Sequence, residues 1–490
     1  MSTKFDLFST SVTNEERTQK EDTSTKKDLV IDATELAKNN YTEYSMYVSS
    51  GRAYPQIYDG AKSSYRRAIY GMYKGQGQKK MKVAELAALA LPYHPHPTSV
   101  SGVIVQLGEA GNKLKLMDTQ GNWGDSTRGV EASADRYIEG RLSTLAEHLL
   151  CDSIEYAEMV PGEIDKPEPK ALPALLPLCF INGSSGIPSG LPTLNVPTLD
   201  INGMIDYYID VLSHKDLDYR PKKFPNPNLE IDILSNKEDW NNIMQTGKGS
   251  IRTAPRMEID SNNVITITSL PKTKNGEHIR KIIEKEILLD KVDLRDESAK
   301  EIRFVIEKVP HKQCDMKEIF KRLYSKLQSS ETYSMAFFDE EKIYVPCSFH
   351  KVVKSNLQFL IETHQNRIKI QLEQLKVKLR VLEIIEDMKK KNKFKELFDL
   401  DSKEALEYIQ NTYKVDNDIS AKVLQKPLSY LTKEHNQEII DLKNDIKSLE
   451  NDQNDIYEFL IGRYKNIKKE LNQVIKNKFK PTTFVKAQEA

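Results

Sequence analysis

Several kinds of feature are scarce in this sequence, and each scarcity excludes a class of protein. The 490 residues include only four cysteines, which lie far apart, and no two of them have the spacing of metal ligands. We therefore expect neither a disulfide framework nor a cysteine-based zinc site. Cysteine usage of this kind is typical of a protein in a reducing compartment. No apolar run approaches the ~18 residues of a membrane span, and no signal peptide is evident. We expect a cytoplasmic protein without membrane association.

Neither sign of charge is in excess, because 72 Lys and Arg residues balance 72 Asp and Glu residues. This balance excludes a histone-like protein that binds nucleic acid through its overall charge. Basic residues do crowd one segment, and a run of this kind is typical of a solvated helix face or of a nucleic-acid-binding patch. That segment contains Lys62, Arg66, Arg67, Lys74, Lys79, Lys80 and Lys82.

The sequence also lacks a convincing site for a nucleotide or a metal ion. Residues 75–77 (Gly-Gln-Gly) have neither the further glycine nor the strand–helix context of a phosphate-binding loop. Asp399 and Asp401 have the spacing of a metal-binding carboxylate pair, but no apolar strand precedes them. His94 and His96 are too few for a metal site without an accompanying acidic or cysteine cluster. We expect no metal site on this chain.

Changes in composition predict a multidomain α+β protein. Residues 1–30 are polar and aperiodic, which indicates a mobile arm. Residues 31–165 are mostly helical in pattern, whereas residues 166–345 mix proline-rich connectors, short β-like runs and helices. Heptads dominate residues 346–480, and residues 481–490 form a tail.

Two of these regions contain patterns that predict specific structures. Residues 83–91 form a helix that ends at a proline, and residues 99–107 can form a second one, which fits a helix-turn-helix entering the major groove. Apolar residues at heptad spacing in 357–382 and 439–474 predict two antiparallel helices, the first of roughly 45–50 Å. Residues 394–432 between them predict a small globular tip.

Tyr137 is a candidate nucleophile because Arg136 precedes it and Arg141 follows it. A phenol, whose pKa is about 10, needs nearby cations to favour its phenolate and to stabilise charge on an attacked phosphate. Most of the 22 tyrosines must nevertheless serve packing and hydrogen bonding. The surrounding motifs therefore decide between the two interpretations.

Several motifs occur in a fixed order along the chain. They are Gly51-Arg52-Ala53-Tyr54-Pro55 with residues 59–72, Tyr93-His94-Pro95-His96, Arg136-Tyr137, Asn182-Gly183-Ser184-Ser185-Gly186-Ile187, Thr246-Gly247-Lys248-Gly249 and Leu294-Arg295-Asp296-Glu297-Ser298. In this order they resemble the breakage-reunion subunit of type IIA DNA topoisomerases. That family includes the A subunits of gyrase and topoisomerase IV and the medium subunit of T4-like phage topoisomerases. The resemblance covers nearly the whole chain after about residue 30.

The resemblance implies a catalytic role for several of these residues. Tyr137 would attack a DNA phosphorus, leaving a 5′-phosphotyrosine and a free 3′-hydroxyl, while Arg136 would neutralise the crowded phosphate. Arg52 would line the same site. His94 and His96 would contribute hydrogen bonds and positive character near the phosphate.

The resemblance also implies a set of DNA-binding residues. Lys62, Arg66 and Arg67 would bind phosphates of the cleaved strand. Ile187 would insert between base pairs and bend the duplex. Ser99 matches the serine that contacts quinolone-type drugs, although Val103 stands at the acidic partner position. Further departures from the cellular pattern are Tyr58, Ser63, Ser64, Tyr65 and Pro97.

The implied fold is a winged-helix DNA-binding domain, an α/β tower domain and a long antiparallel coiled-coil stalk with a small helical gate tip. Leu424, Leu428, Leu431 and Thr432 match the gate-tip pattern that closes a homodimer. Mg²⁺ and ATP would both be bound by a separate B-type subunit carrying the ATPase and toprim domains, giving an A₂B₂ enzyme on double-stranded DNA. Without a DNA-wrapping propeller after the stalk, we expect relaxation and decatenation rather than supercoiling. The motif departures and short tail favour a phage enzyme.

Two other classes of protein share some of these features. A non-catalytic coiled-coil DNA-binding protein of chromosome organisation would also have basic helices and heptads, but it would not need Arg136-Tyr137 in register with the other motifs. A tyrosine recombinase or relaxase would need an upstream Arg/His constellation or a histidine-rich metal site, and neither is evident.

Overall fold

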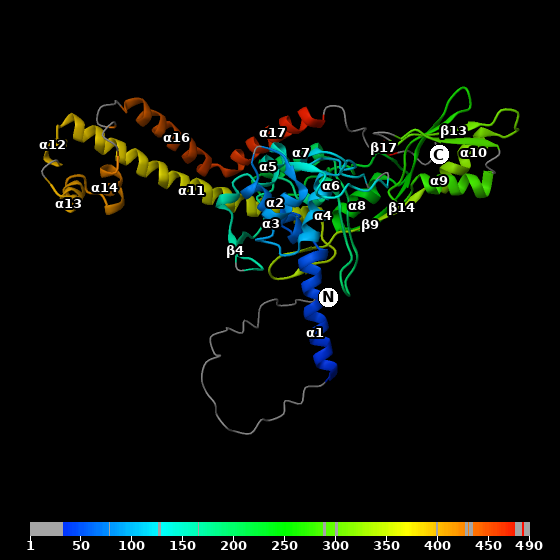
Figure 1. The fold of residues 1–490 in the computed structure, drawn as a ribbon, viewed down its shortest axis with the longest axis horizontal. Coiled ribbons are helices and arrows are strands. Elements are labelled where there is room, and N and C mark those ends of the chain that lie inside the picture. Colours follow the sequence, from blue (N-terminus) through cyan, green and yellow to red (C-terminus); the bar gives the residue numbers. More distant parts are fainter. Residues whose placement is uncertain are drawn as a thin grey trace, which may run out of the picture. The chain divides into compact units, whose positions relative to one another are not determined.

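The computed structural model describes residues 33–77, 79–125, 129–164, 166–287, 291–298, 302–397, 400–426, 430, 435–475 and 483–484. These residues form a mixed α/β protein, as the sequence predicts, with long helices in its C-terminal third (Figure 1). The chain divides into two compact units, one of Met1–Leu360 with Tyr464–Ala490 and one of Ile361–Arg463. The domain boundaries expected from composition stay a prediction.

The first unit opens with α1 (Ala33–Val48) and a short π-helical turn, η1 (Ser49–Ala53), and continues into a group of three helices. These are α2 (Ser63–Gly75), α3 (Val83–Ala90) and α4 (Pro97–Gly108). Gly71 lets α2 and α3 approach closely, because a Cβ there would lie 2.6 Å from Ala90 Cα. The second predicted helix begins at Pro97 rather than Ser99, since the first turn of a helix does not need the N–H that proline lacks.

A small antiparallel sheet accompanies this helical group in the order β1 (Met81–Lys82), β3 (Glu139–Leu142), β2 (Met117–Gln120), and β1 lies between α2 and α3 in the chain. Gly140 of β3 pairs with Met81 and Thr119 on its two sides. The chain then forms α5 (Thr144–Leu150), which Ser143 caps by accepting the Ala146 N–H, and the 3₁₀ turn η2 (Ile154–Tyr156). A two-stranded hairpin comes next, formed by β4 (Met159–Pro161) and β5 (Pro167–Pro169).

A six-stranded sheet, ordered β17-β8-β9-β14-β7-β6, organises the rest of this unit. Its strands are β6 (Ser184–Gly186), β7 (Leu194–Val196), β8 (Asp232–Ile233), β9 (Lys248–Ala254), β14 (Ser329–Ser334) and β17 (Thr483–Phe484). α6 (Leu178–Asn182) precedes β6, α7 (Ile201–Ser213) joins β7 to β8, and α8 (Lys237–Thr246) joins β8 to β9. β15 (Phe337–Phe338) pairs with β16 (Ile343–Tyr344) before the long C-terminal helix begins.

A separate four-stranded antiparallel sheet is inserted between β9 and β14. It contains β10 (Arg256–Ile259), β11 (Ile265–Ser269), β12 (Val292–Asp296) and β13 (Phe304–Lys308). α9 (Gly276–Ile282), the π-helical turn η3 (Ile283–Ile287) and α10 (Met316–Lys326) accompany it. Ile267, Ile279, Ile306 and Leu323 are fully buried in one core between sheet and helices. The strands expected at 264–268 and 302–307 are found here, within two residues.

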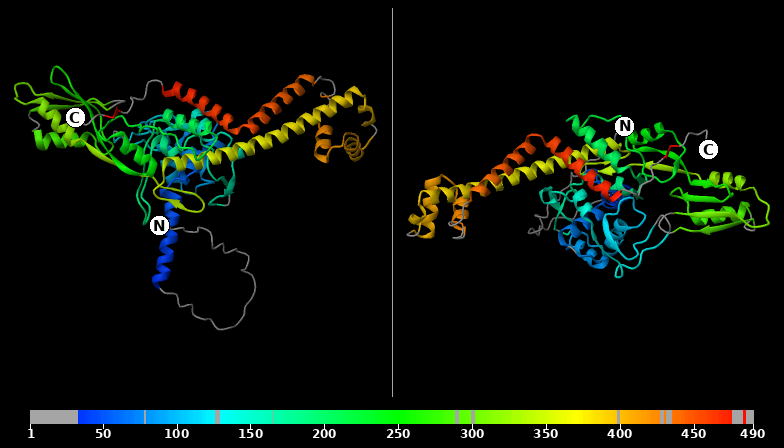
Figure 2. Two further views of the ribbon diagram at one scale, coloured as in Figure 1. Left: turned by 180° about the vertical axis from the view of Figure 1, so that it is seen from behind. Right: turned by 90° about the horizontal axis from the view of Figure 1, so that it is seen from above.

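The second unit contains the stalk helices predicted from the heptads. α11 (Phe349–Lys390) enters it at residue 361, and the later helices are α12 (Phe394–Leu397), α13 (Ser402–Tyr413), α14 (Asn417–Leu424) and α16 (Asn436–Asn454). The last helix, α17 (Ile456–Ile475), leaves the unit after Arg463. α16 runs alongside α11 in every view (Figures 1 and 2). The ion pairs Lys376–Glu450 and Lys443–Glu383 require an antiparallel arrangement. From the first pair to the second, the residue number on α11 rises from 376 to 383 and the residue number on α16 falls from 450 to 443.

Two details of this unit differ from the expectation. α11 has 42 residues, which at ~1.5 Å per residue is longer than the predicted 45–50 Å, since the helix continues past both ends of its apolar seam. The second seam is divided into α16 and α17 at Asp455, whose side chain accepts the Glu458 N–H and so starts a new helix. Leu424 ends α14, whereas Leu428, Leu431 and Thr432 lie outside the described residues.

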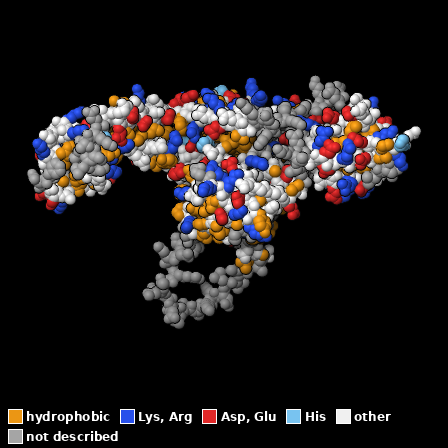
Figure 3. Space-filling view, turned by 45° about the horizontal axis from the view of Figure 1, so that its top comes forward, with side chains coloured by type: hydrophobic (Ala, Val, Ile, Leu, Met, Phe, Trp, Pro, Cys, Tyr) orange, Lys and Arg blue, Asp and Glu red, His pale blue; other side chains and the backbone are white. Residues whose placement is uncertain are grey.

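The surface carries charge of both signs, as a net charge of zero requires. Acidic and basic side chains are interspersed over the face drawn in Figure 3. No described helix is both long enough and apolar enough to cross a membrane.

Candidate functional site

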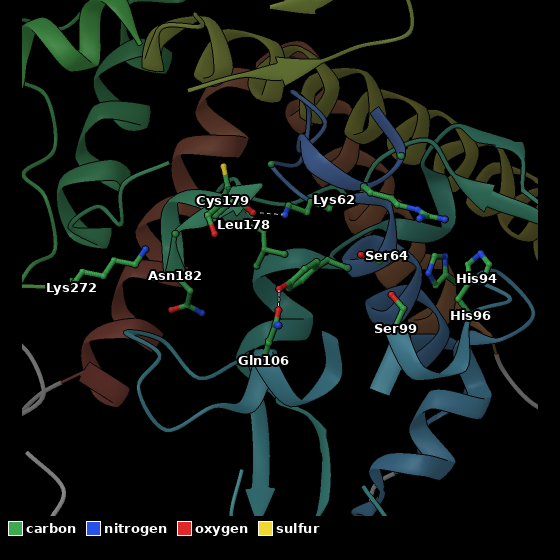
Figure 4. A pocket seen from close by; sticks show the side chains of 17 residues that line it. Lys62, Ser64, His94, His96, Ser99, Gln106, Leu178, Cys179, Asn182 and Lys272 are labelled. Atoms are coloured by element: carbon green, nitrogen blue, oxygen red, sulfur yellow. Dashed lines mark hydrogen bonds between the residues drawn. The ribbon is translucent and has the colours of Figure 1, made fainter. Parts of the chain in front are cut away.

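A cavity of about 790 Å³ in the first unit brings together many of the residues predicted from sequence (Figure 4). Its walls come from η1 and the start of α2, from residues 94–106, from residues 178–185 and from the loop after β11. Of the described residues that line it, none is Asp or Glu. The predicted site residues that line it are Arg52, Lys62, His94, His96 and Ser99.

Arg52 and Lys62 supply fixed positive charge to this cavity. Arg52 is exposed on η1, with its guanidinium carbon 6.0 Å from the ring centroid of Tyr47. Lys62 precedes α2, and its ammonium donates to the Ser185 carbonyl at 2.6 Å. Burial lowers the pKa of Lys62, since a half-buried ammonium without full hydration is disfavoured. The glycine that follows Ser185 lets this segment lie against η1, because a side chain at Gly186 would overlap the Ala53 carbonyl.

The two histidines lie side by side but in different environments. His94 is buried, and His96 is half exposed at a ring-centroid distance of 5.1 Å. The pKa of His94 is lowered, chiefly by burial and then by the charge of Arg67. Because a guanidinium only donates, Nδ1 of His94 accepts from Arg67 at 3.3 Å, which leaves the proton of the neutral ring on Nε2. The Nε2–H of the neutral His94 ring can therefore donate a hydrogen bond, whereas the positive character that we expected near the phosphate stays a prediction.

Arg66 and Arg67 point into the protein, where carboxylates hold them. Arg66 is buried, lies 3.6 Å from Asp59 and donates to Gln56. Arg67 donates twice to Glu168, at 2.7 and 3.0 Å, and also to Glu163. Their contact with DNA stays a prediction, because in this structure both guanidinium groups already have anionic partners.

Tyr137 and Arg136 lie outside the residues that line the cavity. Tyr137 ends a turn in which its N–H donates to the Ala134 carbonyl at 2.8 Å, and 66% of its surface is exposed. The guanidinium carbon of Arg136 is 4.6 Å from the centroid of its ring. The next residue, Ile138, is fully buried, so the turn is anchored to the core immediately beyond the phenol.

The long β2–β3 connection that carries Tyr137 is held by the buried Trp123. Its ring covers Gly108 of α4 and Gly140 of β3, and a Cβ at Gly140 would lie 2.6 Å from it. Its indole N–H donates to the Gln120 carbonyl at 3.1 Å. Ser101 of α4 reaches Asp135 of the same connection at 3.4 Å. The nucleophile candidate is thus tied to the helix whose first turn faces the cavity.

Ile187 and Ser99 occupy positions that suit contact with a ligand. Ile187 follows β6 and is 85% exposed, which is unusual for an isoleucine and excludes it from the core. Ser99 is exposed in the first turn of α4 and lines the cavity. Val103, one turn further on, is buried instead of presenting a polar group beside Ser99.

Sequence reasoning missed several members of the site. Tyr65, noted only as a departure, lines the cavity and donates to Gln106 of α4, and burial raises the pKa of Tyr65 to about 12. Asn182 and Lys272 line it as well. The Asn-Gly-Ser-Ser-Gly motif could have pointed to Asn182, but no local signal distinguishes Gln106 or Lys272.

Potential metal ligands are scattered over the part of the chain that the structure describes. Among these residues, no three His, Cys, Asp or Glu side chains gather in a way that could hold a metal ion. Asp401 caps α13 together with Glu404, and Asp399 lies outside the described residues.

Residues 52–480 match the model of a family described as the A subunit of DNA gyrase/topoisomerase IV. The DNA gyrase A protein of Chlamydia trachomatis is 29% identical over 371 residues, which are 71% of this chain and 44% of that protein. The DNA gyrase A protein of Streptococcus pyogenes is 32% identical over 299 residues, which are 56% of this chain and 36% of that protein. The matched part of this chain therefore spans less than half the length of these relatives.

Proposed function

Because this chain belongs to the family of DNA gyrase and topoisomerase IV A subunits, we propose that it is the DNA cleavage-religation subunit of a type II DNA topoisomerase. The observation that carries the proposal is the exposed Tyr137, with Arg136 over its ring, on a connection anchored to α4. A structural tyrosine would bury its ring or bond its hydroxyl, whereas a nucleophile must reach a substrate.

In the proposed reaction, the phenolic oxygen of Tyr137 attacks a phosphorus of DNA. The phenol releases its proton as a bond forms between its oxygen and the 5′ phosphate. The bond from phosphorus to the 3′ oxygen breaks, and that oxygen takes up a proton, so none is gained or lost overall. Resealing is the reverse transfer, so the phosphodiester energy is kept in the linkage. Arg136 offsets the charge that develops on the phosphate.

The cavity has the chemistry of a DNA-backbone site. Arg52 and Lys62 provide the charge, and Ser99 and the neutral His94 provide hydrogen bonds of the kind that position phosphates. The three helices α2–α4 and the sheet of β1–β3 support the winged-helix assignment, in which α4 is the recognition helix. The sheet of β10–β13 with α9 and α10 supports the tower assignment.

We propose further that the active enzyme is A₂B₂, with this chain as a homodimer closed by its stalk. Mg²⁺ and ATP belong on a B-type subunit in this proposal. Among the described residues of this chain, no three potential ligands gather to hold a metal ion. Relaxation and decatenation, rather than supercoiling, stay a prediction that a plasmid assay tests.

The replacement Tyr137→Phe tests the function. It removes the nucleophilic oxygen and keeps the ring, so we expect duplex binding to persist and covalent protein–DNA adducts to vanish. The measurement is adduct recovery after denaturing a reaction that contains both subunits and plasmid.

Tyr44→Phe is the matched control, because Tyr44 is similarly exposed, at 60%, and lies on α1. Its adducts should equal those of the unaltered chain. Adducts at the unaltered level in Tyr137→Phe would show that another residue is the nucleophile or that the proposed function is wrong.

A further inference from the structure

We infer that Lys272 is a further DNA-binding residue, whose ammonium binds a backbone phosphate of the duplex held at the cavity. The inference rests on the proposed function and extends it. Neither the ordered motifs nor the basic segment of the sequence includes this lysine.

The position of Lys272 in the cavity is the first observation. It lies on the loop that joins β11 to α9, far along the chain from the other cavity cations, and is exposed. Figure 4 shows its side chain beside Asn182, across the cavity from His94 and Ser99. A strand lying over the cavity presents a regular row of phosphates, so cations on opposite walls can bind different ones.

The loop that presents Lys272 is fixed to the neighbouring strand β14. The backbone N–H of Lys272 donates to the buried Glu331, and the hydroxyls of Thr273 and Ser329 lie 2.6 Å apart. Leu270 is buried on the preceding side, and Asn275 caps α9 on the following side. Little backbone freedom remains to be lost when an anion binds, which favours a preformed contact.

The charges around Lys272 leave it available for an anion. Of the described residues lining the cavity, none is acidic, and the Glu163 carboxylate that lies 3.9 Å from His96 belongs to a residue outside this lining. The buried Glu331 attracts Lys272 electrostatically, and burial raises the pKa of that carboxyl. Lysine acts as a point charge, so the contact adds affinity without reading the base sequence.

The test compares Lys272→Gln with Lys274→Gln, both in the Tyr137→Phe background so that binding is measured without cleavage. Lys274 lies on the same loop but does not line the cavity. For Lys272→Gln we expect the slope of log affinity against log salt concentration to fall by about 0.9, the value for one phosphate contact. For Lys274→Gln the slope should stay unchanged. Equal slopes for Lys272→Gln and the parent chain would overturn the inference.

A second arm locates the contact on the DNA. In a set of short duplexes, one phosphate is replaced by a neutral methylphosphonate, at a different position in each duplex. At one position the replacement should weaken binding by the parent chain but not binding by Lys272→Gln. A Lys62→Gln chain should lose its sensitivity at a different position. If the replacement at every position changes the affinity of Lys272→Gln as much as that of the parent chain, the assignment of Lys272 is wrong.

These outcomes are separate from those of the proposed function. Adducts that depend on Tyr137, together with a normal salt slope for Lys272→Gln, would leave the function standing and refute only this inference. A reduced slope without any Tyr137 adducts would refute the cleavage function while showing that Lys272 binds DNA.

Discussion

At the scale of single residues, exposure and pairing separate the groups that can meet a substrate from those that hold the fold. Arg66 and Arg67 have the residue type that suits phosphate binding, yet buried or half-buried carboxylates neutralise both. Arg52 and Lys62 belong to the same segment of sequence and face the cavity instead. Residue type alone therefore does not identify the DNA-binding set, and burial must be added to it.

Ile187 gives a prediction at this scale. Unstacking a base step costs a few kcal/mol, which an apolar side chain offsets by filling the opened gap. Because Ile187 is 85% exposed, Ile187→Ala should leave the thermal unfolding midpoint unchanged and reduce DNA bending and cleavage together. Fluorescence energy transfer across a short end-labelled duplex measures the bend.

Leu191→Ala is the control for this experiment, since Leu191 lies shortly after Ile187 and is 36% exposed. That variant should bend DNA normally. Normal bending and cleavage by Ile187→Ala, or a large loss of stability, would show that Ile187 has only a packing role.

Much of the cavity could be predicted from sequence, and its omissions have a physical reason. Motifs identify residues such as Arg52, His94 and Ser99, each of which belongs to a short run of sequence and lines the cavity. The anionic partner of Arg67 is Glu168, 101 residues away, and Lys272 reaches the site on a loop from another sheet. Contacts of this kind are created by tertiary folding and leave no local pattern.

At the scale of secondary-structure elements, the β2–β3 connection determines where the Tyr137 turn lies. Gly140→Ala should destabilise the chain by about 1–3 kcal/mol, because a Cβ 2.6 Å from the buried Trp123 ring forces the ring to move. Adduct formation should fall with it, since the displaced ring supports the turn. Chemical denaturation and adduct recovery measure the two effects.

Gly102→Ala on α4 is the matched control for stability. A Cβ there meets nothing within 4 Å, so replacing a helical glycine should stabilise by about 0.5–1 kcal/mol. If Gly140→Ala is as stable and as active as the parent, Trp123 does not hold the connection in the way described.

The helical elements also show how far periodicity extends. The heptads correctly predict both stalk helices, because a repeated apolar seam has few alternatives to packing against a partner helix. They do not predict the break at Asp455, since the apolar spacing continues from Leu449 to Ile456 across it. The break is set by the side chain of Asp455, which caps the new helix. A cap depends on one residue, so it leaves no trace in a pattern of apolar spacing.

At the scale of the whole molecule, the chain has a net charge of zero. Its cavity nevertheless has no acidic residue among the described residues that line it. Attraction to DNA must then come from a local surface and not from the overall field. Binding by this chain should therefore involve few phosphates per cavity and remain measurable near physiological salt.

The proposed division of labour limits what the chain can do alone. In the proposed assembly this protein holds and cuts one duplex, while nucleotide binding, which would drive passage of a second duplex, belongs to a B-type subunit. The purified chain should therefore bind duplex DNA but leave plasmid topology unchanged with Mg²⁺ and ATP. Adding the B-type subunit should give ATP-dependent relaxation and unlinking. The Tyr137→Phe chain with the B-type subunit is the control, since it should assemble and hydrolyse ATP without relaxing the plasmid. Robust ATP-dependent relaxation by the single chain would refute the division of labour, and negative supercoils from a relaxed plasmid would refute the predicted topological preference.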